Sequence, residues 1–250
     1  MKRRIFLAGL GLLVASPGWA GLVETIPRVK PSVVAVGTFL ATRNPQFQFL
    51  GTGFVVGDGN QVATNSHVAN AALDKREVEE RLVIALPTTG KVAVRPVEVE
   101  ASAPEFDLAV LRFKGPSLPP LPLAEEEDVR EGQDVALTGF PLGGSIGIIP
   151  VTHKGIVAAI TPLGQPVPNA RDLQPGAIRR LSQGSYPVLQ LDIVSYPGNS
   201  GSPLYAVESG LVVGVLNMTF VKGMKENAIS APSGISYAIP VSRLKALLKR

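Results

Sequence analysis

The sequence reads SYPGNSGSPLY from Ser195 to Tyr205, and this stretch decides which fold is expected. Glycines on both sides of Asn199-Ser200 free the backbone from side-chain clashes. Neighbouring N–H groups can then converge beside one serine and bind the negative oxygen of a tetrahedral intermediate. The same composition is also typical of an ordinary surface turn. A base and a carboxylate elsewhere in the chain are therefore needed before Ser200 is interpreted as a nucleophile.

Only two histidines, His67 and His153, are present to act as that base. A serine hydroxyl reacts when a histidine removes its proton and a carboxylate orients the histidine. His67 stands in ATNSHVAN, where a predicted strand gives way to a turn, whereas His153 lies inside the strand-like VTHKGIV and is interpreted as a surface or structural residue. Asp107 heads the apolar strand DLAVLRF, and a histidine N–H would satisfy a carboxylate in such a setting.

Most of the chain is predicted to form short strands separated by Gly and Pro. Segments such as SVVAVGTFL, GTGFVVGDGNQVATN, FDLAVLRF, QDVALTGFP and GLVVGVLNM are rich in Val, Ile, Leu and Phe. VGDGNQV supplies a hairpin turn, and a turn or two of helix is expected after His67. The last ten residues, VSRLKALLKR, place Val241, Leu244 and Leu248 on one helical face. So many strands with so little helix predict an all-β barrel or sandwich.

Two long irregular stretches interrupt the predicted strands. The first, GPSLPPLPLAEEEDVREG over 115–132, separates two β-rich halves and is either a domain linker or an ordinary long loop. The second runs from Thr161 to Pro187, and loops of that length are usually functional or mobile.

The first twenty residues are interpreted as a cleaved export signal. Three cations precede an apolar run from Ile5 to Ser16, and small residues follow at Gly18 and Ala20. Both the general secretory and the twin-arginine route fit, and a retained anchor is the alternative. This segment holds three of the 24 basic residues and none of the 20 acidic ones, so the remainder carries almost no net charge. Neither nucleic acid nor an anionic membrane is expected as a partner.

The residue types available exclude several kinds of chemistry. The chain contains no cysteine, which rules out a thiol nucleophile, a thiolate metal site and an iron–sulfur cluster. Two histidines are too few for a three-histidine zinc site, and no HExxH motif occurs. We therefore expect no metal and no cofactor. The 230 residues after the signal are enough to bury about 70% of their unfolded surface, so the fold needs no disulfide or metal for stability.

The order His67, Asp107, Ser200 is that of chymotrypsin and differs from the orders in α/β-hydrolases and subtilisins. The chain resembles trypsin-like serine proteases of the HtrA (DegP) type over roughly residues 22–248. The similar segments are GTGFVV, VATNSHVAN, DLAVLRF, LPLAEEEDVREGQDVALTGFPLG, THKGIVAAI, QLDIVSYPGNSGSPL and ISYAIPV, in that order.

The resemblance implies two six-stranded antiparallel β-barrels, a short C-terminal helix and a site in the cleft between the barrels. We expect a signal peptide over 1–20, an N-terminal barrel with the histidine and aspartate over 21–122, and a C-terminal barrel with the serine over 123–250.

Residue roles follow from the same resemblance. His67 would be the general base, Asp107 the residue that orients it and Ser200 the nucleophile. The N–H groups of Gly198 and Ser200 would form the oxyanion hole. The residues expected to contact substrate are Val194, Ser195, Leu216, Asn217 and Met218. No acid lies where it would hold an Arg or Lys side chain, so apolar residues are expected before the cut. The strand GVLNMTF would pair with the extended substrate.

The chain departs from the family pattern in three places. Ser202 replaces a glycine and Ser66 an alanine, and the chain stops at Arg250, where the family typically continues into a PDZ domain. Gating through such a domain is therefore not expected.

Three classes of function remain open. The first is an exported serine endopeptidase that cleaves unfolded or misfolded polypeptides and is periplasmic or secreted. The second is a catalytically weak chaperone or binding module on a protease scaffold, and the third is an acyl hydrolase that acts on esters. The resemblance also implies a homo-oligomer, namely a trimer, with no membrane span once the signal is removed.

Overall fold

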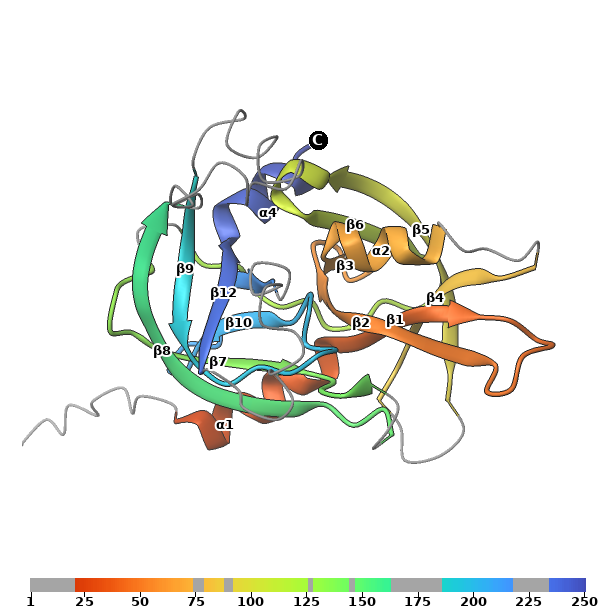
Figure 1. Ribbon diagram of the computed structural model, residues 1–250, viewed down its shortest axis with the longest axis horizontal. Coiled ribbons are helices and arrows are strands. Elements are labelled where there is room, and N and C mark those ends of the chain that lie inside the picture. The colour runs from red at the N-terminus through yellow and green to blue at the C-terminus, as the bar shows by residue number, and fades with distance from the viewer. Residues whose placement is uncertain are drawn as a thin grey trace, which may run out of the picture.

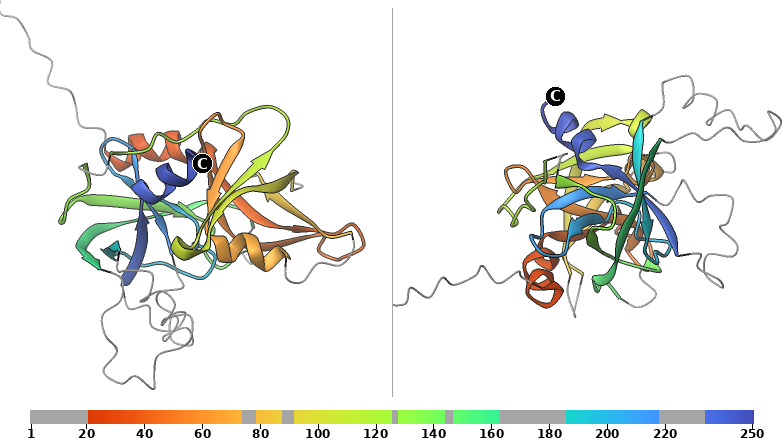
Figure 2. Two further views of the ribbon diagram at one scale, coloured as in Figure 1. Left: turned by 90° about the horizontal axis from the view of Figure 1, so that it is seen from above. Right: turned by 90° about the vertical axis from the view of Figure 1, so that its left-hand side faces the viewer.

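Two closed β-barrels stand side by side in the computed structural model of the chain (Figure 1). The structure describes residues 21–73, 79–87, 92–125, 128–143, 147–162, 186–217 and 234–250. Seen from above, the orange-to-yellow barrel and the green-to-blue barrel again lie next to each other (Figure 2). The predicted fold class, an all-β protein with two six-stranded antiparallel barrels, is confirmed.

The first barrel closes in the strand order β1-β2-β3-β6-β5-β4, with every pair antiparallel. Its strands are β1 (Val33–Phe39), β2 (Phe47–Val56), β3 (Gln61–Thr64), β4 (Arg81–Ala85), β5 (Val94–Ala103) and β6 (Leu108–Phe113). β2 and β3 meet at the hairpin that VGDGNQV predicts, where Gly57 and Gly59 have φ of 61° and 86°. Only glycine adopts such angles readily, so the turn chemistry sets this register.

The second barrel closes in the order β10-β11-β12-β9-β8-β7, also with antiparallel pairs throughout. Its strands are β7 (Asp134–Gly139), β8 (Val151–Pro162), β9 (Pro187–Asp192), β10 (Pro203–Ala206), β11 (Val212–Leu216) and β12 (Ile235–Pro240). The irregular stretch expected over 161–187 is shorter than predicted, because β8 continues through Pro162 and β9 begins at Pro187. Residues 163–185 lie outside the described residues. The predicted domain boundary at 122/123 falls between β6 and β7 and stays a prediction.

In the described part of the chain, three α-helices accompany the barrels, together with the short 3₁₀ segments η1 (Lys30–Ser32) and η2 (Pro104–Phe106). They are α1 (Leu22–Val29), which the sequence analysis does not predict, α2 (Ser66–Leu73) and α4 (Val241–Leu248). In α4 Val241, Leu244 and Leu247 are buried, and Leu248 is half-buried and packs against the same core, so the predicted face of Val241, Leu244 and Leu248 also includes Leu247. None of the described helices has the length and hydropathy needed to cross a bilayer.

Strand β1 is buried on both faces, and its two faces pack into different hydrophobic clusters. Val34 and Val36 pack inside the first barrel, whereas Val33 and Ala35 belong to the larger core that includes the interior of the second barrel. Successive residues of a strand point to opposite faces, so the unbroken run VVAV suits a strand covered on both sides. The contact between the two barrels at β1 is therefore apolar.

His153 lies in β8, in a structural setting outside the cleft. Its ring packs 5.7 Å, centroid to centroid, from that of Tyr196. Its Nε2 is buried and has no hydrogen-bond partner among the residues that the structure describes. Burial disfavours the imidazolium form and lowers the pKa of His153 below the ordinary 6.5.

This histidine is expected to reduce stability at acid pH. Because the unfolded chain protonates at higher pH than the folded one, the free energy of unfolding falls as pH drops below about 6.5 and is unaffected above that range. Thermal unfolding of the wild type and of His153→Gln at pH 7.5 and pH 5 measures the effect. The variant should lose less Tm over this interval, and equal losses would contradict the assignment.

Candidate active site

The pairing of β3 with β6 brings His67 and Asp107 to one end of the first barrel. Thr64, the last residue of β3, is the register partner of Ala109 near the start of β6. The strands are antiparallel, so the segment leaving β3 and the segment entering β6 emerge at the same place. His67 is the second residue of α2 after β3, and Asp107 immediately precedes β6.

Asp107 holds His67 through two separate contacts. Its Oδ2 lies 2.7 Å from His67 Nδ1, and its Oδ1 accepts the His67 backbone N–H at 2.8 Å. A carboxylate only accepts hydrogen bonds, so Nδ1 carries the proton in this pair and Nε2 is left as an acceptor. The Asp107 backbone has φ of 54°, which is uncommon for a residue other than glycine. Such strained residues cluster at functional sites.

The second barrel also contacts this carboxylate. Asn217 directly follows β11 and is fully buried, and its Nδ2 donates to Asp107 Oδ2 at 2.8 Å. The Asp107 carbonyl accepts from Ser66 N and from Asn65 Nδ2, both at 3.1 Å. The acid is therefore held from both barrels, with 19% of its side chain exposed against 35% for His67.

The turn that carries Ser200 requires glycine at two positions. Gly198 has φ of 101° and Gly201 has φ of 85°. A Cβ on Gly198 would stand 2.4 Å from the Phe140 carbonyl oxygen, and a Cβ on Gly201 would stand 2.1 Å from the Thr52 carbonyl oxygen. Real Cβ atoms do not approach backbone oxygen so closely, so a side chain at either position would displace the turn. The glycines flanking Asn199-Ser200 are thus a steric requirement of this site.

Thr52 of β2 clamps the serine turn to the first barrel. Its backbone N–H donates to the Ser200 carbonyl at 2.9 Å, and its hydroxyl donates to the Gly198 carbonyl at 2.8 Å. The same hydroxyl accepts the Phe140 N–H at 3.1 Å. Residues of both barrels therefore fix the backbone on each side of Ser200.

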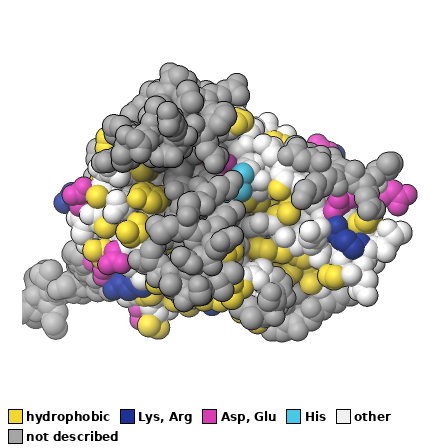
Figure 3. All heavy atoms as spheres, in the orientation of Figure 1, with side chains coloured by type: hydrophobic (Ala, Val, Ile, Leu, Met, Phe, Trp, Pro, Cys, Tyr) yellow, Lys and Arg dark blue, Asp and Glu magenta, His cyan; other side chains and the backbone are white. Residues whose placement is uncertain are grey.

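Ser200 and the His67 segment meet at Gly51. A Cβ built there would lie 2.8 Å from the side chain of Val68, which follows His67, and 3.1 Å from the Ser200 carbonyl. Figure 3, in the orientation of Figure 1, shows a histidine side chain at the molecular surface, near a group of hydrophobic side chains. Among the described residues no hydrogen bond joins the Ser200 hydroxyl to the His67 ring. Contacts of this kind often tighten only when substrate binds.

The backbone groups expected to form the oxyanion hole have no protein partner among the described residues. Within the described part of the chain, neither Gly198 N–H nor Ser200 N–H donates to another residue. The Pro197 carbonyl accepts the Leu142 N–H at 2.7 Å. In a trans peptide the C=O and the following N–H point in opposite directions, so this hydrogen bond also fixes the direction of the Gly198 N–H.

The residues expected to contact substrate differ in how they are placed. Val194 is half-buried, and the Ser195 hydroxyl lies 2.6 Å from that of Ser236, which donates to the Ile193 carbonyl. Leu216 is buried, its N–H donates to Ser202, and its carbonyl accepts from Gly201. The Asn217 side chain donates to the Asp107 carboxylate, and its backbone N–H donates to the Tyr237 carbonyl. Met218 lies outside the described residues.

Two contacts that hold the site together are not predicted from the sequence: that of Thr52 with the serine turn and that of Asn217 with Asp107. GTGFVV reads from sequence as a strand, and the threonine between its two glycines marks the place where the serine turn approaches β2. The contact of Asn217 with Asp107 has no local signal, because the residues are 110 positions apart and lie in different barrels. No group of three or more His, Asp or Glu side chains suited to a metal is found in the described ranges.

The fold and this arrangement define a class of protein. The family model described as the trypsin-like peptidase domain matches residues 51–215, and the chain belongs to that family. The matched segment carries all three residues of the expected site, His67, Asp107 and Ser200.

Individual relatives narrow the resemblance. A probable periplasmic serine endoprotease, DegP-like, from Pseudomonas fluorescens is 28% identical over 199 residues, which is 80% of this chain and 34% of that protein. A protein of the same description from Halomonas elongata is 28% identical over 193 residues, 77% of this chain and 33% of its own length. The chain thus spans about a third of these relatives. The crystal structure of Deg5 matches with a TM-score of 0.61 and 26% identity over 90% of both chains.

Proposed function

We propose that this chain is an exported serine endopeptidase that cleaves unfolded or misfolded polypeptides, with Ser200 as nucleophile, His67 as general base and Asp107 as the residue that orients the base. The observation that carries the proposal is the two-point contact between Asp107 and His67, made beside a serine turn that Thr52 clamps to the same barrel. The relatives described as periplasmic serine endoproteases support the activity and the compartment.

The first half of the reaction forms an acyl-enzyme. His67 Nε2 takes the proton of the Ser200 hydroxyl while the oxygen attacks the carbonyl carbon of the substrate. Asp107 remains ionised, stabilises the imidazolium and keeps the ring in the tautomer that frees Nε2. The N–H groups of Gly198 and Ser200 then stabilise the oxyanion of the tetrahedral intermediate.

Breakdown of this intermediate completes the acyl-enzyme and releases the first product, and hydrolysis of the acyl-enzyme releases the second. The imidazolium gives its proton to the leaving amine as the peptide C–N bond breaks, and the amine departs. A water molecule then attacks the ester carbonyl, with His67 again acting as base, and Ser200 regains its proton. The protein's own groups perform each of these proton transfers.

An apolar residue is expected before the cut bond. Ser195 is among the residues expected to contact the substrate before the cut bond. Its hydroxyl lies against that of Ser236, which also donates to the Ile193 carbonyl, so these two side chains bring no charge to that part of the site. An uncharged wall offers nothing to an Arg or Lys side chain, because a cation leaving water needs a charged or strongly polar partner.

The proposal is tested by reaction of the folded protein with a fluorophosphonate probe, followed by peptide mapping and by hydrolysis of casein. We expect a single labelled residue, Ser200, together with casein fragments. A folded protein that neither labels nor cuts casein contradicts the proposal and favours the binding or chaperone module. Labelling with ester turnover but without cleavage of any peptide favours the acyl hydrolase.

A further inference from the structure

Three side chains from distant parts of the chain form a cluster around the residue before Asp107. Phe106 ends η2, Tyr186 directly precedes β9, and Arg243 is the third residue of α4. The guanidinium carbon of Arg243 lies 4.7 Å from the centre of the Phe106 ring and 5.6 Å from that of Tyr186. The two rings meet edge to face, with centroids 5.1 Å apart and an interplanar angle of 86°. A cation over two aromatic rings that also contact each other is an attractive arrangement.

The guanidinium of Arg243 is held by these rings. Among the described residues Arg243 forms no hydrogen bond and no ion pair. Its side chain is half-buried, and Tyr186 is only 8% exposed. A contact between a cation and a ring strengthens when water is partly excluded from it. The cluster is therefore a stronger constraint than a contact of the same kind at an open surface.

Through this cluster the second barrel contacts a segment of the first. Helix α4 follows β12, yet it packs against β5 and β6 as well as against β11 and β12 (Figure 1). The buried side of α4 joins the hydrophobic core against which Phe106 also packs. Segment η2 connects β5 to β6. Arg243 and Tyr186 thus hold η2 from outside the barrel to which it belongs.

The backbone of Asp107 depends on η2. Asp107 is the residue at which η2 ends, and its N–H donates to the Pro104 carbonyl at 3.1 Å. Its φ of 54° and ψ of 42° lie in the left-handed region, which is costly for a residue with a side chain and persists only where the surroundings impose it. Because the peptide unit between Phe106 and Asp107 is planar, fixing Phe106 also fixes the backbone that enters Asp107.

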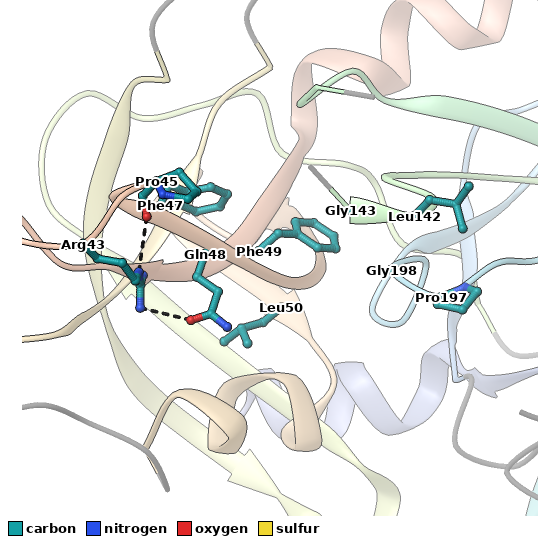
Figure 4. A pocket seen from close by; sticks show the side chains of 10 residues that line it. All are labelled: Arg43, Pro45, Phe47, Gln48, Phe49, Leu50, Leu142, Gly143, Pro197 and Gly198. Carbon is teal, nitrogen blue, oxygen red and sulfur yellow. Dashed lines mark hydrogen bonds between the residues drawn. The ribbon is translucent and has the colours of Figure 1, made fainter. Parts of the chain in front are cut away.

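The cluster lies apart from the cavity beside the serine turn. That cavity, of about 930 Å³, is lined by residues of β2 and of the chain before it, by the loop after β7 and by the serine turn (Figure 4). Phe106, Tyr186 and Arg243 do not line it. They are also not among the residues expected to contact substrate. A change in the cluster should therefore act on kcat more than on KM.

We propose, on the basis of the function proposed above, that Arg243 is a positioning residue for the reaction. By holding the Phe106 ring against Tyr186, it keeps η2 in the shape that turns the Asp107 carboxylate toward the His67 ring. Arg243 takes no part in the proton transfers and acts only through the backbone of Asp107.

The test is Arg243→Met, which keeps an unbranched apolar side chain and removes the guanidinium. On a quenched peptide we expect kcat to fall by about fivefold or more, the scale of one contact between a cation and a ring. KM should stay within about twofold of the wild type. Arg243→Lys keeps a cation and should recover about half of the loss or more.

The pH profile distinguishes positioning from a general loss of stability. The acidic limb of kcat/KM reports protonation of the base in the free enzyme. A carboxylate that has moved away from the His67 ring stabilises the imidazolium less, so the base remains unprotonated to lower pH. In Arg243→Met the acidic limb should therefore move to lower pH by about half a unit, a fraction of the worth of a hydrogen bond to a charged group.

A second pair of variants changes the other side of the contact. Phe106→Leu removes the ring but keeps an apolar side chain, and it should give the same fall in kcat and the same shift of the acidic limb. Phe106→Tyr keeps the ring and should retain the wild-type profile. If Arg243 acts through Phe106, the double variant of Arg243→Met and Phe106→Leu should lose no more activity than either single variant.

Two matched controls remove a cation elsewhere. Lys245 lies on the same helix, with its Nζ 2.5 Å from Glu125 Oε1, so Lys245→Met loosens α4 without removing the cation over Phe106. Arg95 lies over the Phe113 ring at 5.3 Å, at the end of β5 away from η2, so Arg95→Met removes the same kind of contact at a distant place. Both controls should keep kcat within about twofold and leave the acidic limb unchanged, whatever their Tm.

The outcomes separate this inference from the proposed function. A wild-type protein that neither labels at Ser200 nor cuts any peptide contradicts both. If the wild type is active, a folded Arg243→Met with the wild-type kcat and acidic limb contradicts the positioning role alone. A fall in kcat without a shift, or an equal shift in Lys245→Met, does the same. Should Arg243→Met fail to fold, Phe106→Leu and Arg243→Lys decide by the same two measurements.

Discussion

Replacing Ser200 with alanine is expected to lower kcat on a peptide substrate by about a million-fold and to leave the fold intact. Losses of that size are typical when the nucleophile of a serine protease is removed, because only binding and the oxyanion hole remain. The Ser200 side chain makes no hydrogen bond within the described residues, so its removal strips no structural contact. Initial rates on a quenched peptide and the Tm of the variant measure the two effects.

The control for this experiment is the serine two residues further along. Ser202 is fully buried, and its hydroxyl has no partner among the residues that the structure describes. It fits because Gly139 opposite has no side chain, and a Cβ there would overlap the Ser202 hydroxyl. Because its hydroxyl has no partner to lose among the described residues, Ser202→Ala should keep kcat within about tenfold of the wild type. Hydrolysis that survives Ser200→Ala would contradict the nucleophile assignment.

Local patterns predicted many short strands and an all-β barrel or sandwich for a physical reason, whereas the two six-stranded barrels were what the resemblance implied. Period-two alternation and the Gly-rich hairpin between β2 and β3 are encoded in neighbouring residues. The turn around Ser200 was predictable for the same reason, because backbone positions with positive φ favour glycine, and glycine can be read in the sequence. The chain order of His67, Asp107 and Ser200 then limited the choice of fold.

What the sequence does not encode locally is how the barrels face each other. Thr52 reaches Gly198 across 146 positions, and Asn217 reaches Asp107 across 110. Both contacts depend on how the two barrels are placed, and no window of neighbouring residues contains that information. Leu142 is a similar case. Its positive φ and its hydrogen bond to Pro197 follow from the loop's position against the serine turn and not from a turn-forming residue type.

Replacing Asp107 with asparagine is expected to reduce kcat by about ten thousand-fold, although the two side chains have nearly the same shape. The carboxylate now faces the His67 ring N–H and the Asn217 amide N–H, both donors. An asparagine whose oxygen takes the Oδ1 position, where it accepts the His67 backbone N–H, turns its NH₂ to the ring, and Nδ1 must then accept. The ring proton moves to Nε2, which can no longer take the proton of Ser200.

Asn217→Ala separates this tautomer effect from simple loosening of the acid. It removes one of the donors to Asp107 but leaves the carboxylate facing His67. Losing one hydrogen bond to a charged group corresponds to a drop in kcat of about tenfold. Peptide hydrolysis and fluorophosphonate labelling should fall in the order wild type, Asn217→Ala, Asp107→Asn. An Asp107→Asn protein within tenfold of wild-type kcat would mean that the acid does not set the state of His67, however closely the two side chains lie.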